Sequence, residues 1–311
     1  MSDKYELNNF ARLAKGIFGN RWHYFGHHVA NFTPFIRSVY AACIDLRVID
    51  EDAPLAMLRE IKNIGGRKNY EPHYDQLLQK LAEILVMRQM VKMPWPRDTS
   101  FEIEAGVAGS PKRIDLVMTL PEGKKFGFEV KAPNYTSHAR LREGKPFEFP
   151  TQIGKQTSEI QNPSDHKAVL PRDNTVRGFL RSADEKFEAF SARHDFCGTL
   201  VIVWDDWMSE VIDPLFGDKT GLLTPAIYSK TDGDPEDFRN IDAVLILRHL
   251  THFAEAAGAN NLPDDGDDPM SIGGRDPAPN IIKELSGFEL PEFIKNGFRA
   301  VPLDQGYLLG R

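Results

Sequence analysis

Cysteine is scarce in this sequence. Cys43 and Cys197 are the only two among 311 residues, and neither belongs to a CxxC or a Cys/His pattern. A disulfide framework needs several paired cysteines, and a structural zinc site needs closely spaced ligands, so the sequence predicts neither. Two isolated thiols are typical of a reducing compartment, and we expect a cytoplasmic protein.

Long apolar runs are also missing. No stretch approaches the roughly 18 apolar residues that a helix needs to cross a bilayer. The N-terminal stretch MSDKYELNNFARLAKG contains no apolar segment of the kind found in signal peptides. We therefore expect a soluble protein with no membrane partner.

The chain has no excess of positive charge. Its formal net charge is −7, which excludes a basic coat for nucleic acid but not a local basic patch. The stretch GDKTG lacks the GxxxxGK[ST] spacing of a phosphate-binding loop, so an NTPase is not predicted. Hydrophobic residues make up 41% and charged residues 27%, as in ordinary globular proteins with a buried core.

The spacing of apolar residues changes along the chain. Residues 1–92 carry apolar side chains at helical spacing, whereas 101–107, 113–120 and 125–132 alternate as strands do. Residues 197–207 (CGTLVIVWDDW) have the composition of a strand buried on both faces. Further on, we expect helices over 151–162 and 183–195 and a strand, or the start of a helix, over 241–250.

This order predicts a mixed α/β protein with one central sheet. We divide the chain into a helical N-terminal region (1–74), a core (75–260) and a C-terminal extension (261–311) that begins with an acidic loop rich in glycine and proline. The N-terminal region is expected to serve as an accessory or dimerisation unit.

Two of the expected strands form a hairpin that brings charged side chains together. If residues 121–123 (PEG) form a three-residue turn, Leu120 pairs with Lys124 and Asp115 falls opposite Glu129. Side chains alternate along a strand, so Glu129 and Lys131 point to the same face. The sequence therefore predicts that Asp115, Glu129 and Lys131 converge, unless a bulge shifts the register.

Two carboxylates so close repel each other unless one is protonated or a cation lies between them. A hard divalent ion, Mg²⁺ above all, prefers oxygen ligands of this kind, and Mn²⁺ can replace it. A lysine beside such an ion can orient attacking water or stabilise charge on a phosphoryl transition state. The structural alternative is a hairpin with an ordinary Lys–Glu pair on a solvated face.

The arrangement resembles the PD-(D/E)XK nuclease superfamily. An aspartate on one strand (Ile114-Asp115) is separated by 13 residues from Glu129-Val130-Lys131 on the next strand. The resemblance covers roughly residues 75–205 and implies a restriction-endonuclease-like αβββαβ core. It implies that Asp115 and Glu129 bind Mg²⁺, together with Val130, which lies between Glu129 and Lys131. It also implies that Lys131 is the catalytic lysine. Isoleucine stands where the family motif has proline.

Members of this family often add a glutamate from the preceding helix. Glu83 is our candidate for this catalytic role, although on a helical wheel it lies far from the apolar stripe of its helix. Asp75, Glu71 and the strand residues Glu102 and Glu104 remain alternatives.

Substrate contacts are expected in the polar, basic stretch that follows the motif. Lysine and arginine meet phosphates without reading sequence. The expected partner is DNA, with RNA still open, and by resemblance we expect the protein to form a homodimer. The residues that we expect to bind substrate are Arg140, Arg142, Lys145, Lys155 and Gln156.

The leading hypothesis is therefore a Mg²⁺-dependent DNA endonuclease of the type II restriction or phage-defence kind. A nuclease of repair, recombination or transposition uses the same chemistry and is the first alternative. A non-catalytic nucleic-acid-binding or interaction module is the second.

Overall fold

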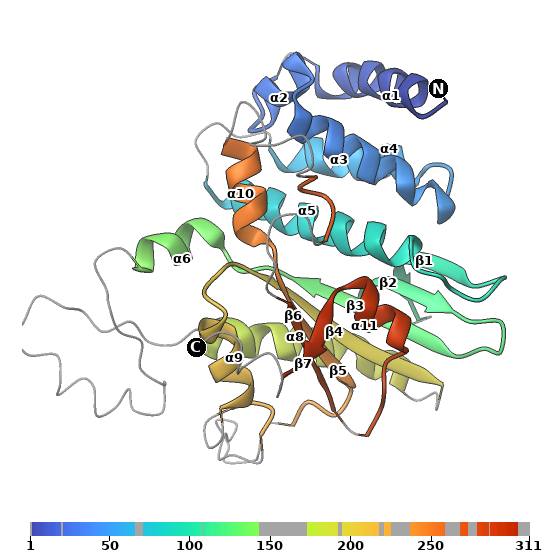
Figure 1. The fold of residues 1–311 in the computed structure, drawn as a ribbon, viewed down its shortest axis with the longest axis vertical. Coiled ribbons are helices and arrows are strands. Elements are labelled where there is room, and N and C mark those ends of the chain that lie inside the picture. The colour runs from blue at the N-terminus through green and yellow to red at the C-terminus, as the bar shows by residue number, and fades with distance from the viewer. Residues whose placement is uncertain are drawn as a thin grey trace, which may run out of the picture.

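The described residues form one sheet of seven strands, which lie in the order of the sequence from β1 to β7 (Figure 1). In the part of the chain that is described, no helix is both long and apolar enough to span a membrane. The computed structural model describes residues 2–19, 21–65, 71–107, 109–142, 173–191, 195–217, 221–224, 237–258, 268–272, 279–285 and 287–303.

The N-terminal region is helical, as the apolar spacing predicts. Thr33 begins one helix by accepting a hydrogen bond from the backbone N–H of Ile36, with Pro34 in the first turn. The elements are α1 (Ser2–Phe18), α2 (Gly26–Asn31), α3 (Pro34–Asp45), the 3₁₀ helix η1 (Leu46–Val48), α4 (Ala53–Ile64) and α5 (Glu71–Val91).

The sheet is mixed. The first three strands form an antiparallel meander, and the next two run parallel to the third. The sixth strand is antiparallel to the fifth, and the seventh is parallel to the sixth. The strands are β1 (Ser100–Gly106), β2 (Arg113–Thr119), β3 (Lys125–Lys131), β4 (Phe196–Trp204), β5 (Ala243–Arg248), β6 (Asn280–Glu284) and β7 (Ala300–Pro302).

The remaining helices connect these strands. The helix expected over 183–195 begins earlier, at Asp173, and the segment 241–250 proves to be a strand followed by a helix. The helix expected over 151–162 lies outside the described residues. The connecting helices are α6 (Tyr135–Arg142), α8 (Asp173–Ser191), α9 (Ser209–Phe216), α10 (Leu250–Gly258) and α11 (Glu292–Gly297).

The two faces of the sheet are covered by different helices (Figure 1). One apolar cluster joins the sheet to α1–α5 and α10, and a second joins it to α8 and α9. Phe126, Phe128 and Val130 belong to the first cluster. Because side chains alternate along a strand, Glu129 and Lys131 point toward the face that α8 covers.

The expected regional boundaries do not coincide with breaks in packing. Residue 74 falls inside α5, and the first apolar cluster continues from α1 through α5 to the sheet. The extension 261–311 contributes β6 and β7 to the same sheet. These strands are five and three residues long, too short to give a clear alternating pattern in the sequence.

Buried histidines make the stability of this fold depend on pH. His249 hydrogen-bonds through Nε2 to the carbonyl oxygen of Pro269 at 2.7 Å, and burial lowers its pKa to about 4. Burial also lowers the pKa of His28, whose ring nitrogens contact Thr33 Oγ1 and the carbonyl of Ala257. Such a group binds a proton more readily in the unfolded chain, so stability falls as pH drops below about 6.5.

We expect His249 alone to lower the free energy of unfolding by about 2 kcal/mol between pH 7 and pH 5. Urea unfolding at the two pH values measures this loss. In His249→Gln the loss should shrink by that amount, because glutamine can donate to Pro269 but does not titrate. An unchanged loss in the variant would show that other groups carry the pH dependence.

Candidate active site

The strands β2 and β3 separate at the predicted site. Their pairing follows the predicted register up to Leu116 opposite Phe128, and the backbone N–H of Leu120 donates to the carbonyl of Lys124 at 2.8 Å. Gly123, at φ +94°, gives the turn the left-handed conformation that it needs. Beyond this last strand pair, the backbone N–H of Val130 donates to Oδ2 of Asp115 at 2.7 Å. A carboxylate thus takes the place of strand pairing.

A glutamine from α5 also binds the backbone of β3 where the two strands separate. Gln79 Oε1 accepts from the backbone N–H of Ala132 at 2.5 Å, and its Nε2 donates to the carbonyl of Val130 at 3.0 Å. The same Nε2 donates to Glu83 Oε1 at 3.0 Å. Gln79 therefore holds the end of β3 in place and connects it to α5.

Glu129 lies at the centre of the cluster and is fully buried. Its Oε1 accepts from Lys131 Nζ at 2.7 Å and from Lys186 Nζ of α8 at 2.5 Å. Lys186 Nζ also lies 3.8 Å from Asp115 Oδ1. The other oxygen, Oε2, is buried and has no hydrogen-bond partner among the described residues. A buried carboxylate oxygen without a donor is costly, so this atom is a natural ligand for a cation.

The environment of Asp115 also disfavours a charged carboxylate. Its pKa is raised to about 7, first by burial and then by the charges of Glu129 and Glu83. Lys186 and the N–H of Val130 act in the opposite direction but do not cancel this rise. Near neutral pH, the protonated and ionised forms of Asp115 are therefore both populated. A further positive charge beside the carboxylate would favour the ionised form.

The oxygen atoms of the cluster suit a hard divalent cation as ligands. Asp115 and Glu129 supply carboxylate oxygens, and the carbonyl of Val130 has a second lone pair beyond the one that faces Gln79. No group of three or more His, Cys, Asp or Glu side chains with metal-binding geometry occurs among the described residues. Two carboxylates with water ligands still match the usual coordination of Mg²⁺.

The structure places Glu83 at the edge of the cluster. It accepts from Gln79, forms an ion pair with Lys80, and raises the pKa of Asp115. Lys80 in turn pairs with Glu60 of α4 at 2.7 Å. Whether Glu83 takes part in catalysis stays a prediction.

The alternatives to Glu83 have other roles in the structure. Asp75 Oδ1 accepts from both the N–H and the hydroxyl of Thr136, which lies in the first turn of α6. Glu71 forms an ion pair with Arg140. Glu102 and Glu104 are exposed on β1, two strands away from β3 in the sheet.

The predicted substrate contacts are only partly placed. Arg140 is exposed on α6 and paired with Glu71. Arg142 is the last residue of that helix, and its side chain is outside the description. Lys145, Lys155 and Gln156 also lie outside the described residues, so their role stays a prediction.

Sequence reasoning missed Lys186 and Gln79 as parts of the cluster. Lys186 lies on α8 between Ala183 and Phe187, which are buried against the sheet. A lysine beside the apolar stripe of a helix is a detectable signal, because its long side chain must run along buried surface. Gln79 gives no such signal, since an isolated glutamine in a long helix is ordinary.

Comparison with known proteins adds no assignment. A scan against protein-family models, a search of curated proteins and a search of solved structures each found no match to this chain.

Proposed function

We propose that this protein is a Mg²⁺-dependent phosphodiesterase, and specifically a DNA endonuclease of the type II restriction or phage-defence kind. The observation that carries the proposal is the convergence of Asp115, Glu129 and Lys131 where β2 and β3 separate. Glu129 Oε2 is buried without a hydrogen-bond partner among the described residues, and this oxygen atom is therefore free to coordinate a cation.

The order of elements supports the same proposal. Helix α5 precedes an antiparallel meander of three strands, and α8 precedes β4, which is parallel to β3. This order agrees with a restriction-endonuclease-like core, in which the motif strand is the third of the meander. The N-terminal helices and β5–β7 would then be additions to that core.

Each residue of the cluster has a distinct task in this mechanism. A bound Mg²⁺ would lower the pKa of a water ligand and neutralise charge on the phosphate. Asp115 and Glu129 would hold the ion through their oxygens. Lys131, whose Nζ is 2.7 Å from Glu129 Oε1, would orient the attacking water and stabilise negative charge on the phosphoryl oxygens. Lys186 would supply a second positive charge beside the same phosphate.

A non-catalytic nucleic-acid-binding module is the second candidate. The observation that favours it is that Lys131 and Lys186 both contact Glu129 Oε1, which compensates that carboxylate without a metal ion. In this alternative, the raised pKa of Asp115 would keep a large fraction of its carboxyl groups protonated and uncharged near pH 7, and no divalent ion would be needed.

Cleavage of nucleic acid tests the proposal. Purified protein is incubated with supercoiled plasmid and phage DNA in the presence of Mg²⁺, Mn²⁺ or EDTA. Discrete fragments that require metal support a sequence-specific endonuclease, whereas a metal-dependent smear keeps the chemistry and removes the restriction assignment. Absence of cleavage of both DNA and RNA with either metal contradicts the proposal.

A further inference from the structure

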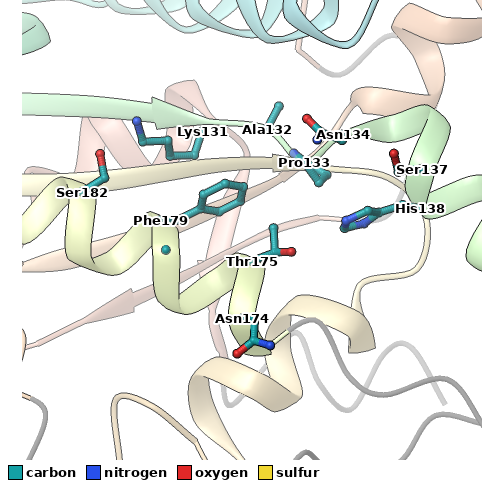
Figure 2. A pocket seen from close by; sticks show the side chains of 11 residues that line it. Lys131, Ala132, Pro133, Asn134, Ser137, His138, Asn174, Thr175, Phe179 and Ser182 are labelled. Atoms are coloured by element: carbon teal, nitrogen blue, oxygen red, sulfur yellow. The ribbon is translucent and has the colours of Figure 1, made fainter. Parts of the chain in front are cut away.

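A cavity of about 600 Å³ opens directly beside the cluster. Lys131 forms one end of it, and the cavity continues between the residues that follow β3, the first turn of α6 and one face of α8 (Figure 2). Its size is that of a small-molecule site, large enough for one nucleotide. The cavity therefore adjoins the position where a phosphate would meet Lys131.

The wall formed by α8 leads straight to the cluster. Asn174, Gly178 and Ser182 line the cavity at four-residue intervals, and the next step along the same helix face is Lys186. Lys186 contacts Glu129 at 2.5 Å. A ligand bound along this wall would thus lie next to both lysines of the cluster.

Gly178 is the most informative residue of this wall. Glycine is a poor helix former, yet it lies inside the 19-residue helix α8 on an exposed face. A Cβ atom built at this position meets no described atom within 4 Å. Packing within the described structure therefore does not require glycine here, and its effect is to leave the cavity open.

The chemistry of the lining suits a nucleotide. The ring of Phe179 lies between α8 and the end of β3 (Figure 2) and offers a flat apolar face. Asn134, Asn174 and Ser182 line the same space, and their side chains form no hydrogen bond with another described residue. The described lining residues include no carboxylate that would repel a phosphate.

We propose that this cavity receives one unstacked nucleotide of the substrate, next to the phosphodiester bond at Lys131. The base would stack on Phe179, and the amide and hydroxyl groups would contact its edges. This inference rests on the proposed nucleic-acid substrate and narrows it. The protein would act on a single strand, or on a duplex from which one nucleotide has been turned out of the stack.

The test measures binding separately from cleavage. Fluorescently labelled single-stranded DNA and RNA oligonucleotides and a DNA duplex are titrated with protein in EDTA, and the dissociation constants are obtained by anisotropy. Gly178→Leu, which fills the cavity, and Phe179→Ala, which removes the stacking face, are each expected to weaken binding of the preferred strand about ten-fold. Gly178→Ala is the matched control, because a methyl group leaves most of the cavity open.

Folding is monitored in the same variants. Gly178→Ala and Gly178→Leu should both raise the midpoint of thermal unfolding, by roughly 1–2 °C, because alanine and leucine are better helix formers than glycine. Weaker binding by a variant that is at least as stable as wild type cannot arise from unfolding.

A second arm locates the nucleotide in the strand. Each base of the oligonucleotide is removed in turn, leaving an abasic linker. Removal of the base at one position should weaken binding to wild type about ten-fold. The same removal should leave the affinity of Phe179→Ala almost unchanged, because the two changes remove the same contact.

The outcomes separate this inference from the proposed function. Metal-dependent cleavage with unchanged binding by Gly178→Leu and Phe179→Ala overturns the cavity assignment and leaves the nuclease intact. Binding that depends on Gly178 and Phe179, without any cleavage, supports the cavity and overturns the proposed chemistry. Wild-type protein that binds neither strands nor duplex overturns both.

Discussion

Replacing Lys131 with alanine is expected to lower the rate of metal-dependent phosphodiester cleavage by about 10²–10³-fold. In the proposed mechanism, Lys131 stabilises charge that develops at the phosphate, and loss of one such group typically has an effect of this size. The fold should persist, because Lys186 still pairs with Glu129 at 2.5 Å. Single-turnover cleavage at saturating protein measures the chemical step without the contribution of binding.

Lys125→Ala is the control for this experiment. Lys125 is the first residue of β3, at the opposite end of the strand, and is partly buried like Lys131. The Lys125→Ala variant should cleave at nearly the wild-type rate. Equal rates for Lys131→Ala and wild type would contradict a catalytic role for Lys131.

Replacing Asp115 with asparagine is expected to abolish cleavage and, in the absence of metal, to stabilise the protein. The pKa of Asp115 is raised from 3.8 to about 7, so the folded protein binds the proton more tightly than the unfolded chain does. Stability is therefore lost as pH rises from about 4 to 7, and above pH 7 the ionised aspartate is fully destabilising. Asparagine keeps an acceptor for the N–H of Val130 and removes the charge.

We expect this variant to unfold with a free energy about 2 kcal/mol higher than wild type at pH 8 in EDTA. Urea unfolding measures the difference, which should vanish at pH 4, where Asp115 is protonated in wild type. Asp268→Asn is the contrasting control. Arg88 contacts Asp268 at 2.7 Å and lowers its pKa, so the loss of this charge should destabilise the protein. Destabilisation by both variants would contradict a raised pKa for Asp115.

The hairpin at the site could be predicted because its information is local. The turn 121–123 fixes the register, and the register is confirmed up to Leu116 opposite Phe128. Counting along the strands does not show that they separate one step later. That separation depends on Asp115 taking the N–H of Val130 and on Gln79, which reaches β3 from a helix 51 residues earlier in the chain.

The sequence also does not show which helix supplies the remaining charges. The preceding helix α5 contributes Gln79 and Glu83 at the strand end, but Lys186 comes from α8 on the opposite face of the sheet. Such a contact follows from the packing of the whole sheet and not from local spacing. The cavity is likewise formed by three segments, and only Gly178, a glycine inside a helix, marks it in the sequence.

Titration with Mn²⁺ tests the central claim, that Asp115 and Glu129 hold a divalent cation, most directly. Binding is followed by isothermal titration calorimetry at pH 8 in wild type and in Asp115→Asn, a variant expected to be folded and more stable without metal. We predict saturable binding by wild type, accompanied by a rise in the thermal unfolding midpoint, and at least a ten-fold weaker affinity in the variant. Equal binding by both proteins, or none by wild type, would show that Lys131 and Lys186 simply neutralise a structural cluster.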